Sequence, residues 1–284
     1  MTKARPRIGF QTGRLAVAVI ASSLMAGCGR AQVASCGAGP RLAAAANALS
    51  LDRLAWSPFG RPEIGWRVYG PLTGKEIGSD CPPSLPGFAA RLAEWQNARR
   101  LAGAGVMTSA TLGAMRNLWQ SRRPFVALSR IACPAAPPLA SLAQASRSES
   151  YGGKVILLRP RALAAYRAMA AAARARSAAF AADHRLLTIF SAFRSPAYDD
   201  ARCALEGNCQ GVTRAACSAH RTGLAVDLYL DATPGVAPDS SEDANRAALA
   251  RSPAYRWLVL NAGRFGFVNY PFEPWHWEWT GEPP

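Results

Sequence analysis

The spacing of apolar side chains predicts helices in the first half of the chain. Between residues 49 and 130 the composition is mixed, and apolar residues recur every three or four positions in two stretches. The predicted buried faces are Phe88, Leu92 and Trp95 in the first helix, and Leu112, Met115 and Leu118 in the second. Four tryptophans supply bulk for a core, so we expect a small, mainly helical domain over residues 49–130.

After residue 150 the pattern changes to strands and helices in alternation. Val155–Leu158 and Leu186–Phe190 are typical of strands, and Pro160 suits the first turn of a helix between them. Ser252, which is followed by a proline, is predicted to cap a further helix. We therefore expect a second domain over residues 151–284 that contains both strands and helices.

Two stretches near the C-terminus combine an apolar face with polar side chains on the other face. In residues 224–230 every second residue is leucine or valine, which places Asp227 on the opposite face of a strand. In residues 275–279 three tryptophans share one face, and His276 and Glu278 share the other. These two polar faces are the candidate positions for chemistry.

The chain is basic, and its first residues account for part of the charge. Lys and Arg number 33 against 18 for Asp and Glu, which gives a formal net charge of +15 over 284 residues. Residues 1–14 contain four cations and no acid, and the apolar stretch Leu15–Met25 is too short for a bilayer span of about 20 residues. This combination predicts an export signal over residues 1–27 and a protein of the periplasm or cell envelope.

The end of this signal resembles a bacterial lipobox. The motif is Met25-Ala26-Gly27-Cys28, in which the cysteine after the cut is lipidated. A lipid on Cys28 attaches the protein to the outer or cytoplasmic membrane, and the alternative is a plain signal peptide that is cut nearby. The Ala- and Gly-rich residues 28–48 are predicted to be a tether.

The cysteines indicate disulfides, because these bonds persist outside the cytoplasm. Apart from Cys28, the chain contains Cys36, Cys81, Cys133, Cys203, Cys209 and Cys217. Cys203 and Cys209 lie in one short loop, so either a bond between them or a bond to Cys217 is expected. The remaining connectivity stays open on the sequence alone.

A change of composition separates the two predicted domains. Residues 131–150 contain three prolines and a run of serine and alanine, which is typical of a linker. The predicted order is therefore a signal, a tether, a helical domain, this linker and the second domain.

The strongest chemical signal joins residues of the last two predicted strands. His220 precedes the strand of Asp227 across a Thr-Gly turn, which can fold the imidazole back beside the carboxylate. His276 supplies a second imidazole, and Glu273 lies three residues before it. Two imidazoles and one carboxylate suit a catalytic Zn²⁺ ion, which keeps a fourth position for water.

Each of these residues has a predicted role. His220, Asp227 and His276 are the expected zinc ligands, and Glu273 is the expected base that takes a proton from water. Arg194 is the expected cation that stabilises the oxyanion.

The joint motif resembles that of a known family of peptidases. Ser-x-His-x-x-Gly-x-Ala-x-Asp at residues 218–227, followed by Glu-x-Trp-His at residues 273–276, is similar to the zinc D-alanyl-D-alanine carboxypeptidases of VanY type. These belong to the lysostaphin/D-Ala-D-Ala/hedgehog group. The family's Ser-Gly-Tyr-Arg-Ser motif has Ala192 and Phe193 at its second and third positions here. The resemblance covers residues from about 155 to 280.

The resemblance implies both a fold and an activity. It implies an α+β fold, in which helices flank a small antiparallel sheet that carries the zinc. It also implies removal of the terminal D-Ala from peptidoglycan stem peptides, with Ser218 in contact with substrate. Trp275 is expected to line the cleft.

A second resemblance concerns the helical domain. Trp95-Gln96, the turn at residues 103–107 and Thr111-Leu112 resemble the small helical peptidoglycan-binding domain. That family has Asp-Gly where this chain has Ala104-Gly105. The alternative is a helical packing module without a ligand.

Other functions stay open on the sequence. The same metal site suits an L,D-carboxypeptidase or a peptidoglycan endopeptidase, and a non-catalytic cell-wall-binding protein is a further alternative. The basic charge alone also suits nucleic acid, but no recognition helix or Arg/aromatic RNA motif accompanies it, so no nucleic-acid partner is predicted. His184, in a predicted turn, is expected to be structural.

Overall fold

The computed structural model describes residues 36–209, 216–231 and 233–281, together with Met1. Apart from Met1, the predicted export signal over residues 1–27 lies outside the described residues, and so does Cys28. Residues 34–284 form one unit by their internal contacts. In the described part of this unit, no helix is both long and apolar enough to cross a membrane.

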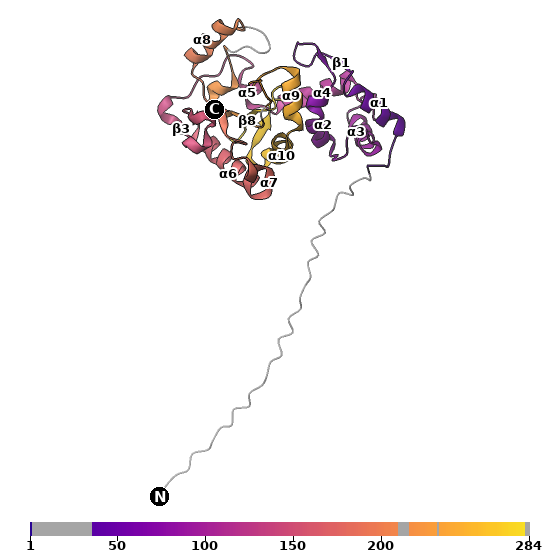
Figure 1. The fold of residues 1–284 in the computed structure, drawn as a ribbon, viewed down its shortest axis with the longest axis horizontal. Helices are drawn as coiled ribbons and strands as arrows, with labels where there is room; N and C mark the ends of the chain where they lie inside the picture. Colours follow the sequence, from indigo (N-terminus) through magenta and orange to yellow (C-terminus); the bar gives the residue numbers. More distant parts are fainter. Residues whose placement is uncertain (2–35, 210–215, 232, 282–284) are drawn as a thin grey trace. The chain divides into compact units, whose positions relative to one another are not determined.

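The first part of this unit, the N-terminal region (residues 36–130), is mainly helical (Figure 1). Its elements are α1 (Arg41–Ser50), β1 (Ala55–Trp56), β2 (Glu63–Ile64), α2 (Gly70–Ile77), α3 (Pro86–Ala98), α4 (Ser109–Ser121) and α5 (Pro124–Leu128). Helices α3 and α4 coincide with the two helices predicted from apolar spacing. Thr108 caps α4 by accepting a hydrogen bond from the backbone N–H of Thr111 at 3.1 Å.

Helix α1 corrects part of the predicted tether over residues 28–48. The segment is helical from Arg41 onward, and its Ala43 and Ala44 pack against Ala89 of α3. Because the buried and the exposed faces are both rich in alanine, the helix leaves no periodic pattern of apolar and polar residues.

The turn between α3 and α4 is held from inside by residues of the motif that resembles a peptidoglycan-binding domain. Gln96 is fully buried, and its amide donates to the Val106 carbonyl at 2.8 Å and to the Thr111 hydroxyl at 2.9 Å. Its side-chain oxygen accepts from the backbone N–H of Gly105 at 2.8 Å. Gly105 has a φ of 87°, and a Cβ there would lie 2.4 Å from the Ala89 carbonyl oxygen. The motif therefore has a structural role here, and glycan binding stays a prediction.

The C-terminal domain (residues 151–281) mixes strands and helices, as its sequence pattern predicts. Its elements are β4 (Leu157–Leu158), α6 (Pro160–Arg176), α7 (Ala178–Ala182), β5 (Ile189–Ser191), α8 (Pro196–Glu206), β6 (Ala225–Leu228), α9 (Asp243–Arg251), α10 (Pro253–Asn261), β7 (Phe267–Asn269) and β8 (His276–Trp279). Four of these strands form an antiparallel sheet in the order β5-β6-β8-β7. This is the predicted α+β architecture, with a small antiparallel sheet and surrounding helices.

The predicted linker over residues 131–150 takes part in this fold. Its strand β3 (Ala143–Gln144) pairs antiparallel with β4, and its Cys133 is bonded to Cys217. The other two disulfides are Cys36–Cys81 and Cys203–Cys209. The last pair is one of the two local alternatives that the sequence left open.

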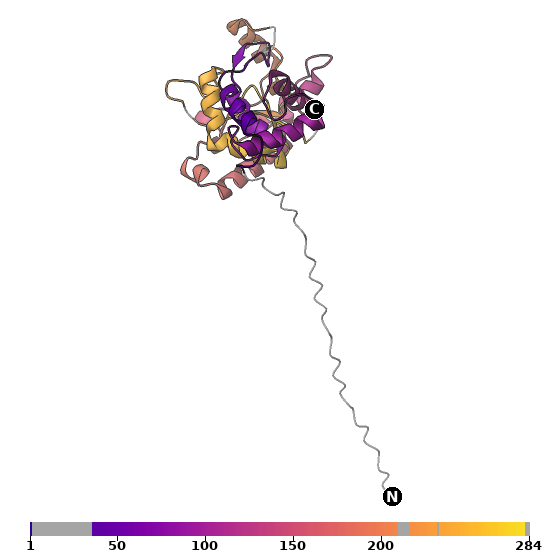
Figure 2. The same cartoon turned by 90° about the vertical axis from the view of Figure 1, so that its right-hand side faces the viewer.

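One hydrophobic core runs through the N-terminal region and the C-terminal domain. At their contact, Phe59 packs edge-on against Tyr270 and Phe272, with ring centroids 5.6 Å and 5.4 Å apart. Figure 2 shows the indigo and purple helices of the N-terminal region in front, with orange and yellow C-terminal elements beside and behind them. The segment of Tyr270 and Phe272 joins β7 to β8, so the N-terminal region packs directly on the connection that precedes His276.

Candidate metal centre

A tight turn places His220 beside the central strand β6. His220 lies in a short 3₁₀ turn, Ala219–Thr222, which ends at Gly223 with a left-handed φ of 70°. A Cβ at Gly223 would lie 3.1 Å from a side-chain carbon of Leu142, so a larger residue meets both backbone strain and crowding there. The turn reverses the chain just before β6 and directs the imidazole towards Asp227, as predicted.

The register of the sheet brings the second histidine to the same carboxylate. Asp227 on β6 lies directly opposite His276 on β8, two strands that are adjacent and antiparallel. The Nδ1 atom of His276 is 2.9 Å from Asp227 Oδ1, and the Nε2 atom of His220 is 3.1 Å from Asp227 Oδ2. One ligand atom of each residue lies within 4.8 Å of the other two. Two buried imidazole nitrogens and one carboxylate oxygen are a donor set that suits a zinc ion with an open position.

The outer nitrogen of each imidazole is also held. His220 Nδ1 lies 2.7 Å from the Ala192 carbonyl oxygen, and His276 Nε2 lies 3.3 Å from Glu278 Oε1. Hydrogen bonds at the outer nitrogen fix the ring orientation and the nitrogen that faces the centre. Glu278 shares the strand face of His276, a face that the sequence marks for chemistry without assigning Glu278 a role of its own.

The charges around the centre set the pKa of each predicted ligand. Burial, together with the nearby Arg194, lowers the pKa of His220 to about 4. Burial acts in the same direction on His276, but its hydrogen bonds to Asp227 and Glu278 outweigh it and raise that pKa to about 9. Burial favours a protonated Asp227, but the two imidazoles reverse this and lower its pKa well below the usual range. Asp227 is thus a carboxylate at neutral pH, the form that binds a cation.

Glu273 lies at the edge of this cluster, in the connection between β7 and β8. Its Oε2 atom is 3.7 Å from His276 Nδ1, and its side chain keeps 29% of its surface exposed. The connection is held by hydrogen bonds from the backbone N–H of Glu273 to the Tyr270 carbonyl and from the amide of Asn269 to the Glu273 carbonyl. Burial raises the pKa of this carboxyl, and the charge of Asp227 acts in the same direction. Glu273 lies beside the three predicted ligands and is not one of them, so its carboxylate is available to act as a base.

Arg194 and Ser218 converge on a buried acid that the sequence analysis missed. Asp199 in α8 is fully buried, and its carboxylate accepts hydrogen bonds from the Ser218 hydroxyl at 3.1 and 3.2 Å. Arg194 Nε lies 3.4 Å from Asp199 Oδ1, and Arg221 Nε lies 3.6 Å from its other oxygen. The only readable signal was local: Ser195 caps α8 and so places Asp199 one turn into a helix.

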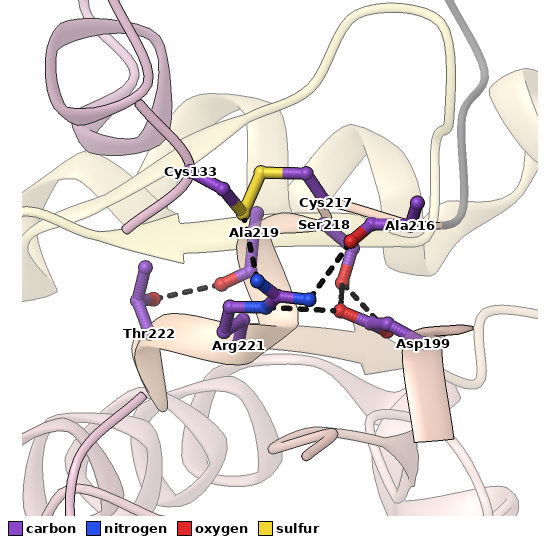
Figure 3. Close-up of a disulfide and its surroundings, with 8 residues drawn as sticks. All are labelled: Cys133, Asp199, Ala216, Cys217, Ser218, Ala219, Arg221 and Thr222. Carbon is purple, nitrogen blue, oxygen red and sulfur yellow. Dashed lines mark hydrogen bonds and ion pairs between the residues drawn. A yellow bond between two sulfur atoms is a disulfide. The ribbon is translucent and has the colours of Figure 1, made fainter. Parts of the chain in front are cut away.

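The disulfide between Cys133 and Cys217 borders this group (Figure 3). Figure 3 shows the Arg221 side chain between the disulfide and Asp199. The guanidinium donates to the Cys133 sulfur at 3.1 Å and to the Ala216 carbonyl oxygen at 2.8 Å. The disulfide thereby holds the start of the turn that carries Ser218 and His220.

The side chains of Trp275 and His184 do not belong to the cluster of predicted ligands. Trp275 is only 3% exposed and belongs to the hydrophobic core, so its side chain presents little surface to a cleft. His184 lies exposed between α7 and β5, in the expected turn.

Comparison with known proteins agrees with the motif. Residues 155–282 match the family model VanY, described as D-alanyl-D-alanine carboxypeptidase. The match spans the four-stranded sheet and every predicted site residue. A search of curated proteins finds no match for the chain.

Proposed function

We propose that this chain is an exported, zinc-dependent enzyme of VanY type that removes the C-terminal D-Ala from peptidoglycan stem peptides, because residues 155–282 match the family model described as D-alanyl-D-alanine carboxypeptidase. The observation that carries the proposal is the buried cluster of His220, Asp227 and His276, with Glu273 at its edge. The family gives the type of bond, and the cluster supplies the groups that its hydrolysis needs.

The three buried side chains would hold the metal through two imidazole nitrogens and one carboxylate oxygen. A bound zinc ion supplies Lewis acidity to the scissile carbonyl and lowers the pKa of water. The outer hydrogen bonds of His220 and His276 orient these ligands, which favours a pre-formed site over one assembled on binding.

Glu273 performs the proton transfers in this proposal. Its carboxylate takes a proton from the attacking water as the new C–O bond forms, and passes it to the amine as the C–N bond breaks. The leaving group is free D-Ala, and Glu273 is again a carboxylate after the proton has passed to the amine. Its raised pKa, caused by burial, brings the carboxyl closer to neutral pH, where both transfers are efficient.

Arg194 and Ser218 are the residues that contact the substrate in this proposal. Arg194 supplies a fixed positive charge for the oxygen that becomes negative, because its guanidinium is oriented by Asp199. Ser218 donates its hydroxyl hydrogen to Asp199, which leaves oxygen lone pairs that can accept an N–H of the peptide. Trp275 supports the ligand strand from the core.

Export is supported by the disulfides. Six cysteines form three bonds, which are characteristic of an oxidising compartment such as the periplasm. Lipid attachment at Cys28 belongs to the same proposal and requires mass analysis of the mature N-terminus.

The test of this function uses a muramyl pentapeptide that ends in D-Ala-D-Ala. We expect the full chain to release free D-Ala, to lose this activity on treatment with a chelator and to regain it with zinc. Metal analysis of the same sample is expected to find a single zinc per chain. Release that survives complete metal removal would contradict the zinc proposal. Release of the dipeptide D-Ala-D-Ala from the pentapeptide, or of D-Ala from a tetrapeptide but not from the pentapeptide, would favour the L,D-carboxypeptidase alternative. Opened cross-links in intact sacculi would favour the endopeptidase alternative.

A second prediction concerns the oxyanion. Arg194→Lys keeps a positive charge but loses the planar fork that meets Asp199 and Ser191, so kcat is expected to fall about 100-fold. Zinc content should stay unchanged, since Arg194 is not a ligand. Arg185→Lys, at an exposed pair with Asp183, is the matched control and is expected to keep full activity. An unaltered kcat in Arg194→Lys would remove this residue from the mechanism.

A further inference from the structure

A buried ion pair connects the N-terminal region to the metal centre. The side chains of Arg123 and Glu278 are 7% and 2% exposed. Arg123 Nε donates to Glu278 Oε1 at 2.7 Å, and Nη2 donates to the same oxygen at 2.5 Å. The second carboxylate oxygen accepts from the backbone N–H of Phe125 at 3.0 Å. Arg123 and Phe125 both lie outside the residues that match the peptidase family.

We propose that the N-terminal region completes the metal centre, with Arg123 acting as a positioning residue for His276 through Glu278. This inference rests on the proposed function. It goes beyond that function because it assigns part of the metal site to a segment outside the residues that match the family model.

Glu278 lies between Arg123 and His276. The oxygen that accepts both hydrogen bonds from Arg123 also lies 3.3 Å from His276 Nε2. A carboxylate at Nε2 favours the imidazole form with its hydrogen on that nitrogen. In the neutral imidazole that metal binding requires, the lone pair of Nδ1, which faces Asp227, is then directed into the centre. The orientation of Glu278 thus determines which nitrogen of His276 is presented to a metal.

Two residues of the N-terminal region fix Glu278. A free carboxylate rotates about its side-chain bonds, but here both oxygens are held by donors from a single segment, Arg123 and Phe125. Arg123 is itself anchored, because its Nη1 donates to the Gln120 side-chain oxygen at 2.8 Å. Arg123 is the N-cap residue of α5 and Phe125 lies in the first turn of that helix, so the spacing of the donors is set by the fold of the N-terminal region.

A second set of contacts also connects Arg123 with His276. The Arg123 guanidinium lies 3.9 Å from the ring centroid of Tyr270, a cation–π contact. That ring packs edge-on against His276, with centroids 5.8 Å apart and planes at 84°. Arg123 therefore supports the imidazole through a hydrogen-bonded chain on one side and through an aromatic ring on another.

A positioning role for Arg123 has a different measurable effect from a role in protein stability alone. A buried ion pair is by itself weak support for stability, because desolvation offsets much of the attraction. Here the pair ends on a metal ligand, and outer hydrogen bonds of this kind typically change metal affinity by about 10- to 100-fold. Metal affinity is therefore the quantity that separates the two roles.

The experiment compares three variants of the full chain: Arg123→Met, Glu278→Gln and Arg122→Met. Arg122 is the adjacent arginine, half-exposed and paired with Glu76, so it is the matched control. The zinc dissociation constant is measured by competition with a chromogenic chelator, and kcat on the pentapeptide is measured with saturating zinc. We expect Arg123→Met and Glu278→Gln each to raise the zinc dissociation constant about 10- to 100-fold and to lower kcat, and Arg122→Met to change neither.

Two further variants, Arg123→Lys and a double variant, test the same positioning role. Arg123→Lys, which retains the charge but only one donor group, is expected to lie between Arg123→Met and the wild type. The double variant Arg123→Met/Glu278→Gln should bind zinc no more weakly than the worse single variant, because both act on one chain of contacts. A folded Arg123→Met chain with wild-type zinc affinity and kcat would overturn the positioning role while the proposed function stands. If Arg123→Met does not fold, wild-type zinc affinity in Glu278→Gln overturns it equally. A wild-type chain that binds no zinc would instead overturn the proposed function and this role with it.

Discussion

Replacing Glu273 by glutamine is expected to lower kcat for D-Ala release on the order of 10³-fold without loss of zinc. The amide has almost the same shape as the carboxylate but cannot accept the proton of the attacking water, and general acid–base groups typically contribute about 10² to 10⁴ in rate. Metal content should stay constant, since the ligand cluster consists of His220, Asp227 and His276. Single-turnover release of D-Ala and zinc analysis on the same sample measure both quantities.

The dependence on pH gives this prediction a second readout. Burial raises the pKa of Glu273, and a base acts only when it is deprotonated. The wild-type rate should therefore fall with decreasing pH at a value above the ordinary glutamate range, and Glu273→Gln should lose this limb. Glu242→Gln, an exposed acid before α9, is the control and should retain both rate and profile. An unchanged kcat in Glu273→Gln would mean that another group takes the proton.

The local signals in the sequence predicted most of the elements that position the site. Pro160 and Ser252 mark the starts of α6 and α10, because the cap and the first-turn proline act over a few residues. The alternation around Asp227 predicted strand β6. Each of these depends on neighbours in the chain, so sequence alone contains the information.

The segment before α10 shows where local signals were insufficient. The four acids at residues 231, 239, 242 and 243 are typical of a solvated loop, but Asp243 begins helix α9. The buried side of α9 includes Asn245 and Arg246, which are polar. Buried polar groups interrupt the apolar stripe of a helix. Asn245 is satisfied by residues 233–240 just before the helix, but Arg246 bonds to Phe272 and Tyr69, which are distant in the sequence.

The cluster of His220, Asp227 and His276 was predictable because the spacing of its residues is characteristic, whereas the residues that support it were not. His276 and Glu278 share a strand face, which period-two alternation shows. The partner of Glu278, however, is Arg123, 155 residues earlier in the chain. With so many arginines in a basic chain, no local pattern distinguishes this one from those on the surface. Long-range pairing is a property of the folded chain, and it also decided the pairing of Cys133 with Cys217.

A second buried arginine joins the two parts of the protein near the connection that carries Glu273. Arg246 is fully buried and donates to the Phe272 carbonyl oxygen and the Tyr69 hydroxyl, both at 2.7 Å. Its guanidinium also lies 3.2 Å from the buried carboxylate of Glu63 in β2. The arginine thus compensates an acid of the N-terminal region and holds the residue before Glu273.

Replacing Arg246 by methionine, which has a similar length but no charge, is expected to reduce the free energy of unfolding by about 3–5 kcal/mol. The reason is that Glu63 then stays buried without its cation, while the Phe272 carbonyl loses its donor. Urea unfolding followed by tryptophan fluorescence measures the change. Arg61→Met is the control, since Arg61 pairs with Asp243 at an exposed site, where such a pair contributes about 0.2–1 kcal/mol.

The double variant Arg246→Met/Glu63→Gln separates an uncompensated charge from lost packing. If the unpaired carboxylate causes most of the loss, removing its charge should recover a large share of the unfolding free energy. If packing around Phe272 causes it, the double variant should be no more stable than Arg246→Met. Equal stability of Arg246→Met and Arg61→Met would show that burial of this arginine contributes nothing. A loss as large as expected would show that this ion pair contributes to the stability of the contact between the N-terminal region and the C-terminal domain, because the acid that Arg246 compensates belongs to the N-terminal region.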